Sequence, residues 1–373
     1  MPAEWEPHAA TWIAWPHNKS DWPGKFEPIP FVYAEMVRHL AREELVNIIA
    51  HDEKIETPAR RVLRLANVAT DNVRFHRWPT NRVWTRDSGP IFVRSASPVT
   101  PGISHRHQSA KGIDASGDGA SPNALNSPLT VLNFKFNAWA KYDDWQHDDL
   151  LPHRIARVLK APEIKPEITC GDKPRRMVLE GGSIDVNGRG TMLTTAECLL
   201  DCDTQPRNPG AKREDVEHAF ADYLGIRKTI WLKRGIVGDD THGHVDDIAR
   251  FVAPDTVVTV VERDRSDANY EITHENLETL QAATDADGKR LRVVELPMPA
   301  PVIFRNQRVP ASYANFYIAN GVVLVPVFSD PNDRIALNTL AELFRERRIV
   351  PIYCGDFIWG LGAIHCATQQ QPA

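Results

Sequence analysis

The sequence is poor in the features that would assign it to a nucleic acid, a membrane or the extracellular space. Its 373 residues carry a net charge of −5, so the strongly basic surface typical of nucleic-acid binding is missing. No apolar run reaches roughly 18 residues, and the N-terminus has no signal-peptide pattern. The 5 cysteines are irregularly spaced, which argues against a disulfide framework and favours a reducing compartment. These absences predict a cytoplasmic protein without nucleic-acid or membrane partners.

What the sequence does contain is one order of elements that recurs along the chain: a hairpin, an amphipathic helix and a strand. The clearest copy has a hairpin over 185–195 turned at Asn187-Gly188, a helix that ends at Gly225, and a strand at 229–233. About five such ββαβ units fill the chain, and repeats of this size close around an axis or stack in a row. They predict a closed α/β propeller with a central site; an ordinary two-domain α/β protein is the alternative.

The other copies follow the same pattern, two after the clearest one and two looser ones before it. The expected hairpins lie over 247–262, 316–328 and 84–93 with 130–136. The expected helices run through 276–284, Asn332 to Arg347, Asp149 to Leu159 and Phe31 to Arg42. The expected strands lie at 291–299, 349–354, 12–16, 45–50 and near Met177 to Leu179. Residues 95–128 are rich in Ser, Gly, Pro and Ala, and we expect a flexible loop inserted between two hairpin strands. The whole chain, 1–373, is expected to form one domain.

Reactive side chains lie beside glycines at four places in the sequence. They are Trp84 and Asp87 in VWTRDSGP, Glu180 in LEGGS, His242, His244 and Asp246 in THGHVDD, and Cys366 in GAIHC. Each motif alone also fits a turn or a surface carboxylate. The HxHxD order of the third motif also opens zinc sites, so a metallo-hydrolase that uses its three side chains is a second interpretation. Asp247, where such a pattern would place a further histidine, argues against metal.

Together the four motifs indicate chemistry on a cation. Carboxylates raise the pKa of a nearby thiol, which is unfavourable unless the substrate is itself positively charged. A guanidinium is planar and permanently charged, and carboxylates can bind it bidentately. A cysteine would attack its central carbon, while a histidine would protonate the departing ammonia and then activate water.

The motifs WTRDSGP, LEGGSID, DTHGHVDDIARF, VPVFSDPND and GAIHCATQQQP resemble, in order and over nearly the whole chain, the agmatine deiminase and bacterial peptidyl-arginine deiminase family. The opening MPAEWEPHAATWIAWP is similar to it as well. The resemblance implies the pentein fold, a five-bladed α/β propeller. It implies Cys366 as nucleophile, His244 as general acid and base, Asp87 and Asp246 as guanidinium ligands supported by Glu180, and Trp84 in the wall of the site.

The same resemblance implies a hydrolase that converts agmatine into N-carbamoylputrescine and ammonia through an S-alkylthiouronium intermediate on Cys366, as in putrescine and polyamine biosynthesis. It implies no metal and no organic cofactor, and it suggests a homodimer. Free arginine or peptidyl arginine is the alternative substrate, and a non-catalytic guanidine-binding relative is a further alternative. Family members commonly read GGGNIHC where this chain has GLGAIHC, with Leu361 and Ala363 at the changed positions.

A second departure from the family pattern lies just before the third motif. His242 stands where the family commonly has an aspartate, which removes one potential partner for a cationic tail. The sequence does not identify the residue that binds the far end of the substrate, and Glu4, Glu6 and His242 are the candidates considered.

Overall fold

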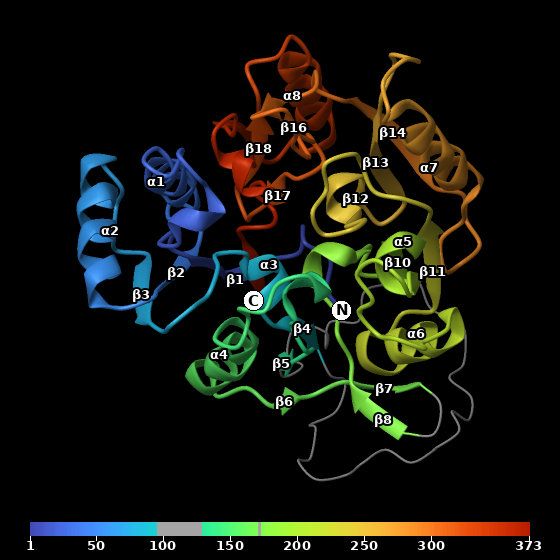
Figure 1. The fold of residues 1–373 in the computed structure, drawn as a ribbon, viewed down its shortest axis with the longest axis horizontal. Helices are drawn as coiled ribbons and strands as arrows, with labels where there is room; N and C mark the ends of the chain where they lie inside the picture. The colour runs from blue at the N-terminus through green and yellow to red at the C-terminus, as the bar shows by residue number, and fades with distance from the viewer. Residues whose placement is uncertain (95–128, 171–172) are drawn as a thin grey trace.

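The computed structural model describes residues 1–94, 129–170 and 173–373, and in this part of the chain five related sheets form a ring (Figure 1). In each sheet the first strand is antiparallel to the second, which is parallel to the third. The sheets are β4 (Ile91–Arg94), β5 (Leu129–Leu132) and β6 (Glu163–Ile164); β9 (Asp185–Val186), β10 (Thr191–Thr195) and β11 (Lys228–Leu232); β12 (Ala249–Ala253), β13 (Thr256–Val261) and β14 (Arg292–Pro297); β17 (Tyr317–Ile318), β18 (Val322–Val327) and β19 (Arg348–Tyr353); and β20 (Gln369–Pro372), β1 (His8–Ala14), β2 (Leu45–Ala50) and β3 (Val73–Arg77). The predicted α/β propeller is therefore confirmed.

A helix joins the two parallel strands of every unit, because parallel neighbours need a long crossover connection. These helices lie at the periphery of the ring (Figure 1). They are α1 (Ile29–Leu40), α4 (Leu151–Leu159), α6 (Arg213–Ala219), α7 (Tyr270–Ala282) and α8 (Asn332–Leu343). A π-helical turn over Phe220–Leu224 continues α6, and Gly225 ends it in the left-handed conformation with a φ of 69°. The outer helices leave the ends of the strands free to meet at the centre.

The C-terminus closes the ring. β20 pairs antiparallel with β1, in a register that sets Thr11 opposite Gln370 and Trp12 opposite Gln369. The backbone N–H of Ala373 donates to the carbonyl oxygen of Pro7 at 2.8 Å. Both chain ends lie near the middle of the ring in Figure 1. The C-terminal segment, which would ordinarily fray, is thus paired as the edge strand of a sheet, and this pairing fixes the residues just before it.

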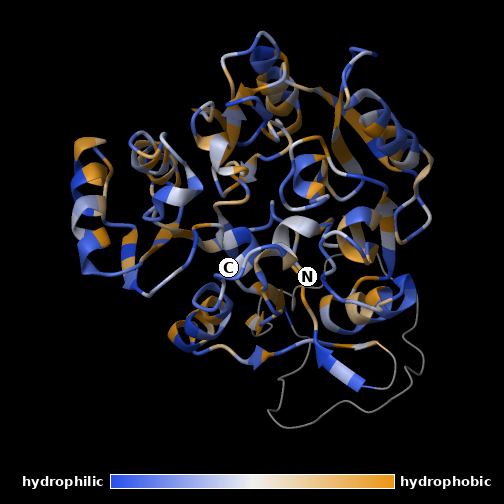
Figure 2. Ribbon diagram, in the orientation of Figure 1, coloured by the Kyte–Doolittle hydropathy of each residue, from blue (hydrophilic) through white to orange (hydrophobic). Residues whose placement is uncertain are grey.

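Apolar side chains fill the space between the sheets and the helices. β13 is buried along its whole length and has the hydrophobic colour in Figure 2, as expected for a strand that is covered on both faces. On α1 the buried face carries Tyr33, Met36, Val37 and Leu40. Within the described ranges, no helix is both long enough and apolar enough to cross a membrane.

Some predicted elements are corrected. The strand expected near Met177 to Leu179 is wrong: only Val178 bridges Lys135, and β6 lies beside β5 instead. Both Met177 and Leu179 are buried apolar side chains, which explains the strand-like pattern.

Two helix ends also differ from the prediction. α8 ends at Leu343 rather than Arg347, because the buried Phe344 leaves the helical conformation. α4 begins at Leu151 rather than Asp149, with Pro152 in its first turn.

Several elements were not predicted from the sequence. α2 (Glu53–Leu65) and β3 extend the first unit. Two hairpins, β7 (Glu167–Cys170) with β8 (Lys173–Arg176) and β15 (Ile303–Phe304) with β16 (Gln307–Arg308), are also additional. The loop expected over 95–128 lies outside the described residues.

Candidate active site

The thiol of Cys366 lies at the centre of the ring. Its loop runs between the 3₁₀ helix η8 (Phe357–Gly360) and β20, and the carbonyl oxygen of Cys366 accepts a hydrogen bond from the backbone N–H of Arg86 at 3.1 Å. The side-chain amide of Asn315 donates to Sγ at 3.1 Å. Only 4% of the residue is exposed. Cys366 is therefore fixed in the interior although it is only a few residues from the chain end.

The other predicted reactive residues gather around the thiol from separate units. Asp87 lies in α3 (Thr85–Ser88), Glu180 lies just before the 3₁₀ turn Gly181–Ser183, and His244 and Asp246 lie at the start of the 3₁₀ turn Val245–Asp247. Asp246 Oδ2 is 3.7 Å from Cys366 Sγ. All the residues predicted for the catalytic site, and Trp84, are thus brought together.

His244 sits among three carboxylates without a direct hydrogen bond to any of them. Its Nδ1 is 3.7 Å from Asp87 Oδ1 and 4.0 Å from Asp246 Oδ1, and its Nε2 is 3.8 Å from Glu180 Oε2. Among the described residues, neither ring nitrogen nor Asp246 Oδ1 has a hydrogen-bond partner, although all are buried. Buried polar groups are usually satisfied. This arrangement leaves donors and acceptors free at the centre of the ring.

The glycine pair of LEGGS has a geometric reason. A Cβ atom at Gly182 would lie 2.6 Å from His244 Nδ1, 2.8 Å from Asp87 Oδ1 and 3.1 Å from Asp246 Oδ2. The backbone N–H of Gly182 also donates to Asp87 Oδ1 at 3.1 Å. The absence of a side chain at this position allows the imidazole and the two carboxylates to approach one another.

A buried ion-pair chain supports Asp246, and sequence reasoning missed it. His365 Nδ1 lies 2.6 Å from Asp246 Oδ2, and His365 Nε2 lies 2.8 Å from Glu4 Oε2. Glu4 in turn accepts hydrogen bonds from Arg250 at 2.8 Å and Arg86 at 2.9 Å. Glu4 was one of three candidates for the far end of the substrate, and its contacts with His365, Arg250 and Arg86 argue against that role. Its place in the similar opening MPAEWEP was the available signal.

Two more contacts, to Asp87 and Glu180, were not predicted from the sequence. The indole N–H of Trp139 donates to Asp87 Oδ2 at 3.0 Å. Arg207 Nε donates to Glu180 Oε1 at 3.1 Å, and both side chains are fully buried. No motif pointed to Trp139 or Arg207, since each comes from a segment without a glycine-rich signature.

Charge and burial shift the pKa values of these groups in different directions. Burial raises the pKa of Asp87 to about 6 despite the nearby His244, with Asp246 and Glu180 adding to the rise. Burial also opposes the charged form of Glu180, but Arg207 and then His244 outweigh it and lower its pKa to about 2. Burial by itself lowers the pKa of His244, but Asp87 makes the largest opposing contribution, and the pKa of His244 lies well above its ordinary value. The imidazole is therefore protonated at neutral pH.

The thiol is in its neutral form in the free protein. Burial raises the pKa of Cys366 well above its ordinary value, and Asp246, Asp247 and Asp87 add to this rise in that order. A carboxylate neighbourhood of this kind disfavours a thiolate until a cation enters. The electrostatics thus match the prediction that the site accepts a positively charged group.

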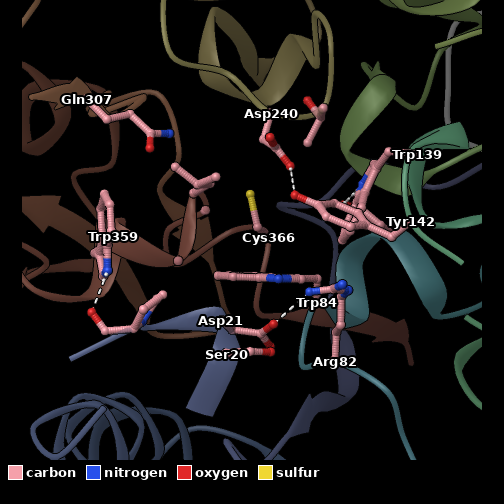
Figure 3. A pocket seen from close by; sticks show the side chains of 16 residues that line it. Ser20, Asp21, Arg82, Trp84, Trp139, Tyr142, Asp240, Gln307, Trp359 and Cys366 are labelled. Carbon is pink, nitrogen blue, oxygen red and sulfur yellow. Dashed lines mark hydrogen bonds and ion pairs between the residues drawn. The ribbon is translucent and has the colours of Figure 1, made fainter. Parts of the chain in front are cut away.

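A cavity of about 360 Å³ leads to the thiol. Figure 3 shows Cys366 at its centre, with Trp84 edge-on below it and Trp139, Tyr142 and Trp359 around the sides. Leu361 also lines the cavity and has a φ of 66°, whereas Ala363 is buried in a separate apolar cluster. Of the two changed positions in GLGAIHC, only Leu361 reaches the cavity.

The proposed metal ligands do not converge. His242 Nε2 contacts Asp201, and its Nδ1 is 4.0 Å from Glu197, so its ring faces a different set of side chains from that of His244. His242 does not line the cavity, and neither does Glu6, so neither is placed to bind the far end of the substrate. The metallo-hydrolase interpretation is therefore not favoured.

The described part of the chain has another group whose potential ligand atoms lie within 4.8 Å of one another: Glu180, Cys198 and His244. The guanidinium of Arg207 already holds Glu180. That positive charge opposes a second cation at this position.

The fold and this centre define a class of protein: a pentein, with a thiol, an imidazole and carboxylates gathered at the axis of an α/β propeller. The model of the Porphyromonas-type peptidyl-arginine deiminase family matches residues 1–372, and the chain belongs to this family. The resemblance noted from the motifs is thereby confirmed.

Similar proteins match over the full length. The chain is 34% identical over 399 residues to the agmatine deiminase of Medicago truncatula, covering 100% of this chain and 96% of the relative. It is 31% identical over 400 residues to the agmatine deiminase of Pseudomonas aeruginosa, covering 100% and 95%.

Solved structures agree with these relatives. The agmatine deiminase of Enterococcus faecalis has a TM-score of 0.83 at 28% identity, covering 100% of this chain and 95% of that one. A cysteine-to-serine variant of the C. jejuni agmatine deiminase with substrate bound has a TM-score of 0.80 at 26% identity, covering 100% and 96%.

Proposed function

We propose that this protein hydrolyses agmatine to N-carbamoylputrescine and ammonia. The observation that carries the proposal is a buried thiol beside several carboxylates in the wall of a cavity. Such a site is unfavourable when empty and becomes favourable when a guanidinium enters it. The full-length similarity to agmatine deiminases supports the same reaction.

We assign guanidinium binding to Asp87, which lines the cavity, and to Asp246, whose Oδ2 lies 3.7 Å from Cys366 Sγ. Asp87 is oriented by hydrogen bonds from Gly182 and Trp139, and Asp246 is held through Oδ2 by His365. Asp246 Oδ1 is buried and unpartnered among the described residues, so it can accept from a guanidinium N–H. Two carboxylates on one planar cation fix the orientation of its central carbon toward Cys366.

The reaction then proceeds in two halves. The bound cation favours the thiolate of Cys366, whose proton passes to solvent, and the thiolate attacks the guanidinium carbon to form a C–S bond. The C–N bond breaks as His244 gives its proton to the leaving ammonia, and an S-alkylthiouronium remains. His244, now neutral, takes a proton from water, and the resulting hydroxide adds to the same carbon. Breakage of the C–S bond, with loss of the hydroxyl proton, releases the ureido product and the thiolate, which takes up one proton to restore the neutral thiol.

The acidic limb of the pH profile follows from Asp87. Because its pKa is about 6, the carboxylate is charged above this pH and protonated below it, where it no longer attracts a guanidinium. We expect log kcat/KM to fall below about pH 6. Butylguanidine has an uncharged tail, so a profile measured with it isolates the guanidinium end of the cavity. Glu180, with a pKa of about 2, does not titrate in this range. A profile that stays flat down to pH 5, roughly one unit below that pKa, would contradict this role of Asp87.

Gly182→Ala tests the close packing of the centre. The added methyl group would displace His244, Asp87 or Asp246, and a misplacement of this size lowers kcat/KM about hundredfold. Gly225→Ala is the control: it introduces a side chain at a left-handed position with nothing within 4 Å. That change costs about 1 kcal/mol of stability and should leave kcat/KM within a few-fold. Equal activities of the two variants would show that the contact at Gly182 is unimportant.

The proposed reaction is tested by measuring ureido product and ammonia with agmatine, free arginine and a blocked arginine peptide. Agmatine should have the highest kcat/KM. A higher kcat/KM for arginine or for the peptide than for agmatine would assign the protein a different substrate, deiminated by the same chemistry. Turnover unchanged after exhaustive chelation would further count against the metallo-hydrolase.

The cellular compartment and the oligomeric state of the protein stay predictions. The free cysteines fit a reducing compartment such as the cytoplasm. A homodimer is the expected assembly, and its mass in solution would test it.

A further inference from the structure

Asp21 is an unusual carboxylate in the wall of the cavity. It ends the 3₁₀ turn Lys19–Asp21, and only 1% of its side chain is exposed. Its Oδ1 accepts a hydrogen bond from Arg82 Nη1 at 2.7 Å, whereas Oδ2 is buried with no hydrogen-bond partner among the described residues. A buried acceptor without a donor is destabilising and calls for an explanation. Because Asp21 lines the cavity, a ligand group bound there is the natural donor to this oxygen.

The charge around Asp21 favours a cation. Its partner Arg82 also donates to Asp144 at 2.9 Å and lies over the ring of Tyr142. The buried Asp148, which accepts from the backbone N–H groups of Asn81 and Arg82, adds a further carboxyl group. One guanidinium therefore faces three carboxyl groups, and it is already bound by two of them. Burial raises the pKa of Asp21 to about 7 while Arg82 acts against the rise, so an added positive charge would restore the charged form.

The same cavity connects Asp21 with the guanidinium site. Asp21, Trp84, Asp87 and Cys366 all line it. In Figure 3 Asp21 and Cys366 lie on opposite sides of the Trp84 ring, which stands edge-on between them. Trp22, the next residue after Asp21, packs on Trp84 with the ring centroids 5.6 Å apart. An alkyl chain that starts at Cys366 would thus pass the apolar ring before it reaches the carboxylate.

We propose that Asp21 binds the primary ammonium of agmatine through Oδ2 and thereby selects agmatine over guanidines with an uncharged tail. This inference rests on the proposed deimination and names the residue that specifies the substrate of the same site. Asp240, the other carboxylate apart from Asp87 in the cavity wall, is less suited because it has Lys141 as its ion-pair partner and also accepts from Tyr142, whereas Arg82 is shared between Asp21 and Asp144. The free oxygen of Asp21 distinguishes the two.

The test compares agmatine with butylguanidine, which has the same four-carbon chain but no amine. Asp21→Asn keeps an oxygen for Arg82 and removes the charge. We expect it to lower kcat/KM for agmatine about 10- to 100-fold, mainly through KM, while kcat/KM for butylguanidine changes less than about threefold. Asp144→Asn is the matched control, because it removes a carboxylate from the same arginine outside the cavity. Its preference for agmatine should equal that of the wild type.

Two further variants keep the inference testable. Asp240→Asn should retain the preference; if it abolishes the preference while Asp21→Asn does not, the ammonium binds on the other side of the cavity and the inference is overturned. Asp21→Glu keeps the charge and extends the side chain by one methylene. It should raise kcat/KM for aminopropylguanidine relative to agmatine, and no such shift, or equal losses on agmatine and butylguanidine in Asp21→Asn, would also overturn the inference.

Binding measurements separate this inference from the proposed reaction. Calorimetry on the Cys366→Ser protein should show tighter binding of agmatine than of butylguanidine, and loss of that difference when Asp21→Asn is added. A wild-type protein that turns over neither compound would contradict the deimination. If that protein still bound agmatine preferentially through Asp21, the ammonium site would stand on its own. Equal affinities for both compounds would overturn it.

Discussion

Replacing Cys366 with serine should lower kcat for agmatine hydrolysis by at least about 10⁴-fold. A hydroxyl is far less acidic than a thiol, and the carboxylates around this position oppose its ionisation further. The loss should fall on kcat rather than on substrate binding, because Asp87 and Asp246 remain to hold the guanidinium. Steady-state kinetics of ammonia release, together with calorimetric binding of agmatine, would measure both quantities.

Cys354 provides the matched control for this substitution. It is fully buried in the apolar core, and burial raises the pKa of its thiol with no carboxylate among the causes. Cys354→Ser should keep kcat within a few-fold even if it lowers stability. Peptide mapping by mass spectrometry of the quenched wild-type reaction should place the covalent adduct on Cys366 and on no other cysteine. Turnover by Cys366→Ser comparable to the wild type would contradict the covalent mechanism.

Replacing His244 with glutamine is expected to lower kcat by about 10³-fold. The amide fills a similar space, but it can neither protonate the leaving ammonia nor accept a proton from water. If the second half of the reaction becomes the slower one, the S-alkylthiouronium on Cys366 accumulates and appears by mass spectrometry. The wild-type imidazole carries its proton at neutral pH, as the first half of the reaction requires.

His242→Gln, two residues earlier, is the control for this variant. Its ring contacts Asp201 rather than the carboxylates around His244, so kcat/KM for agmatine should change less than about threefold. If His242→Gln were the more damaging substitution, the general acid and base would have to be reassigned. Equal losses in both variants would point to a structural effect of this loop rather than to proton transfer.

The repeat could be read from the sequence because its signals are local. Alternating apolar residues, the Asn187-Gly188 turn and the helix-ending Gly225 act within a few residues of themselves, and the corresponding elements were predicted correctly. The prediction failed near Met177 to Leu179, where burial produced a strand-like pattern without a strand ladder. Apolar periodicity reports burial, and hydrogen-bonded pairing has to be supplied by a neighbour in space.

The support of the site could not be predicted in this way. His365, Glu4 and Arg250 form one buried chain although they are separated by hundreds of positions. A charged side chain has no sequence signal that names its partner. For this reason Glu4 stood among the candidates for the far end of the substrate, and no motif pointed to Asp21, which stands in an ordinary turn.

By itself the sequence determined the five-unit repeat, the family motifs and the candidate reactive residues Cys366, His244, Asp87, Glu180 and Asp246. Only the tertiary structure decided that β20 pairs with β1 and so brings a chain-terminal thiol to the axis of the ring. It also decided which carboxylates are already paired and which, like Asp21, keep a free oxygen beside the cavity. The physical reason is that hydrogen bonding and electrostatic interaction depend on distance in space, whereas local patterns specify only the backbone that carries each group.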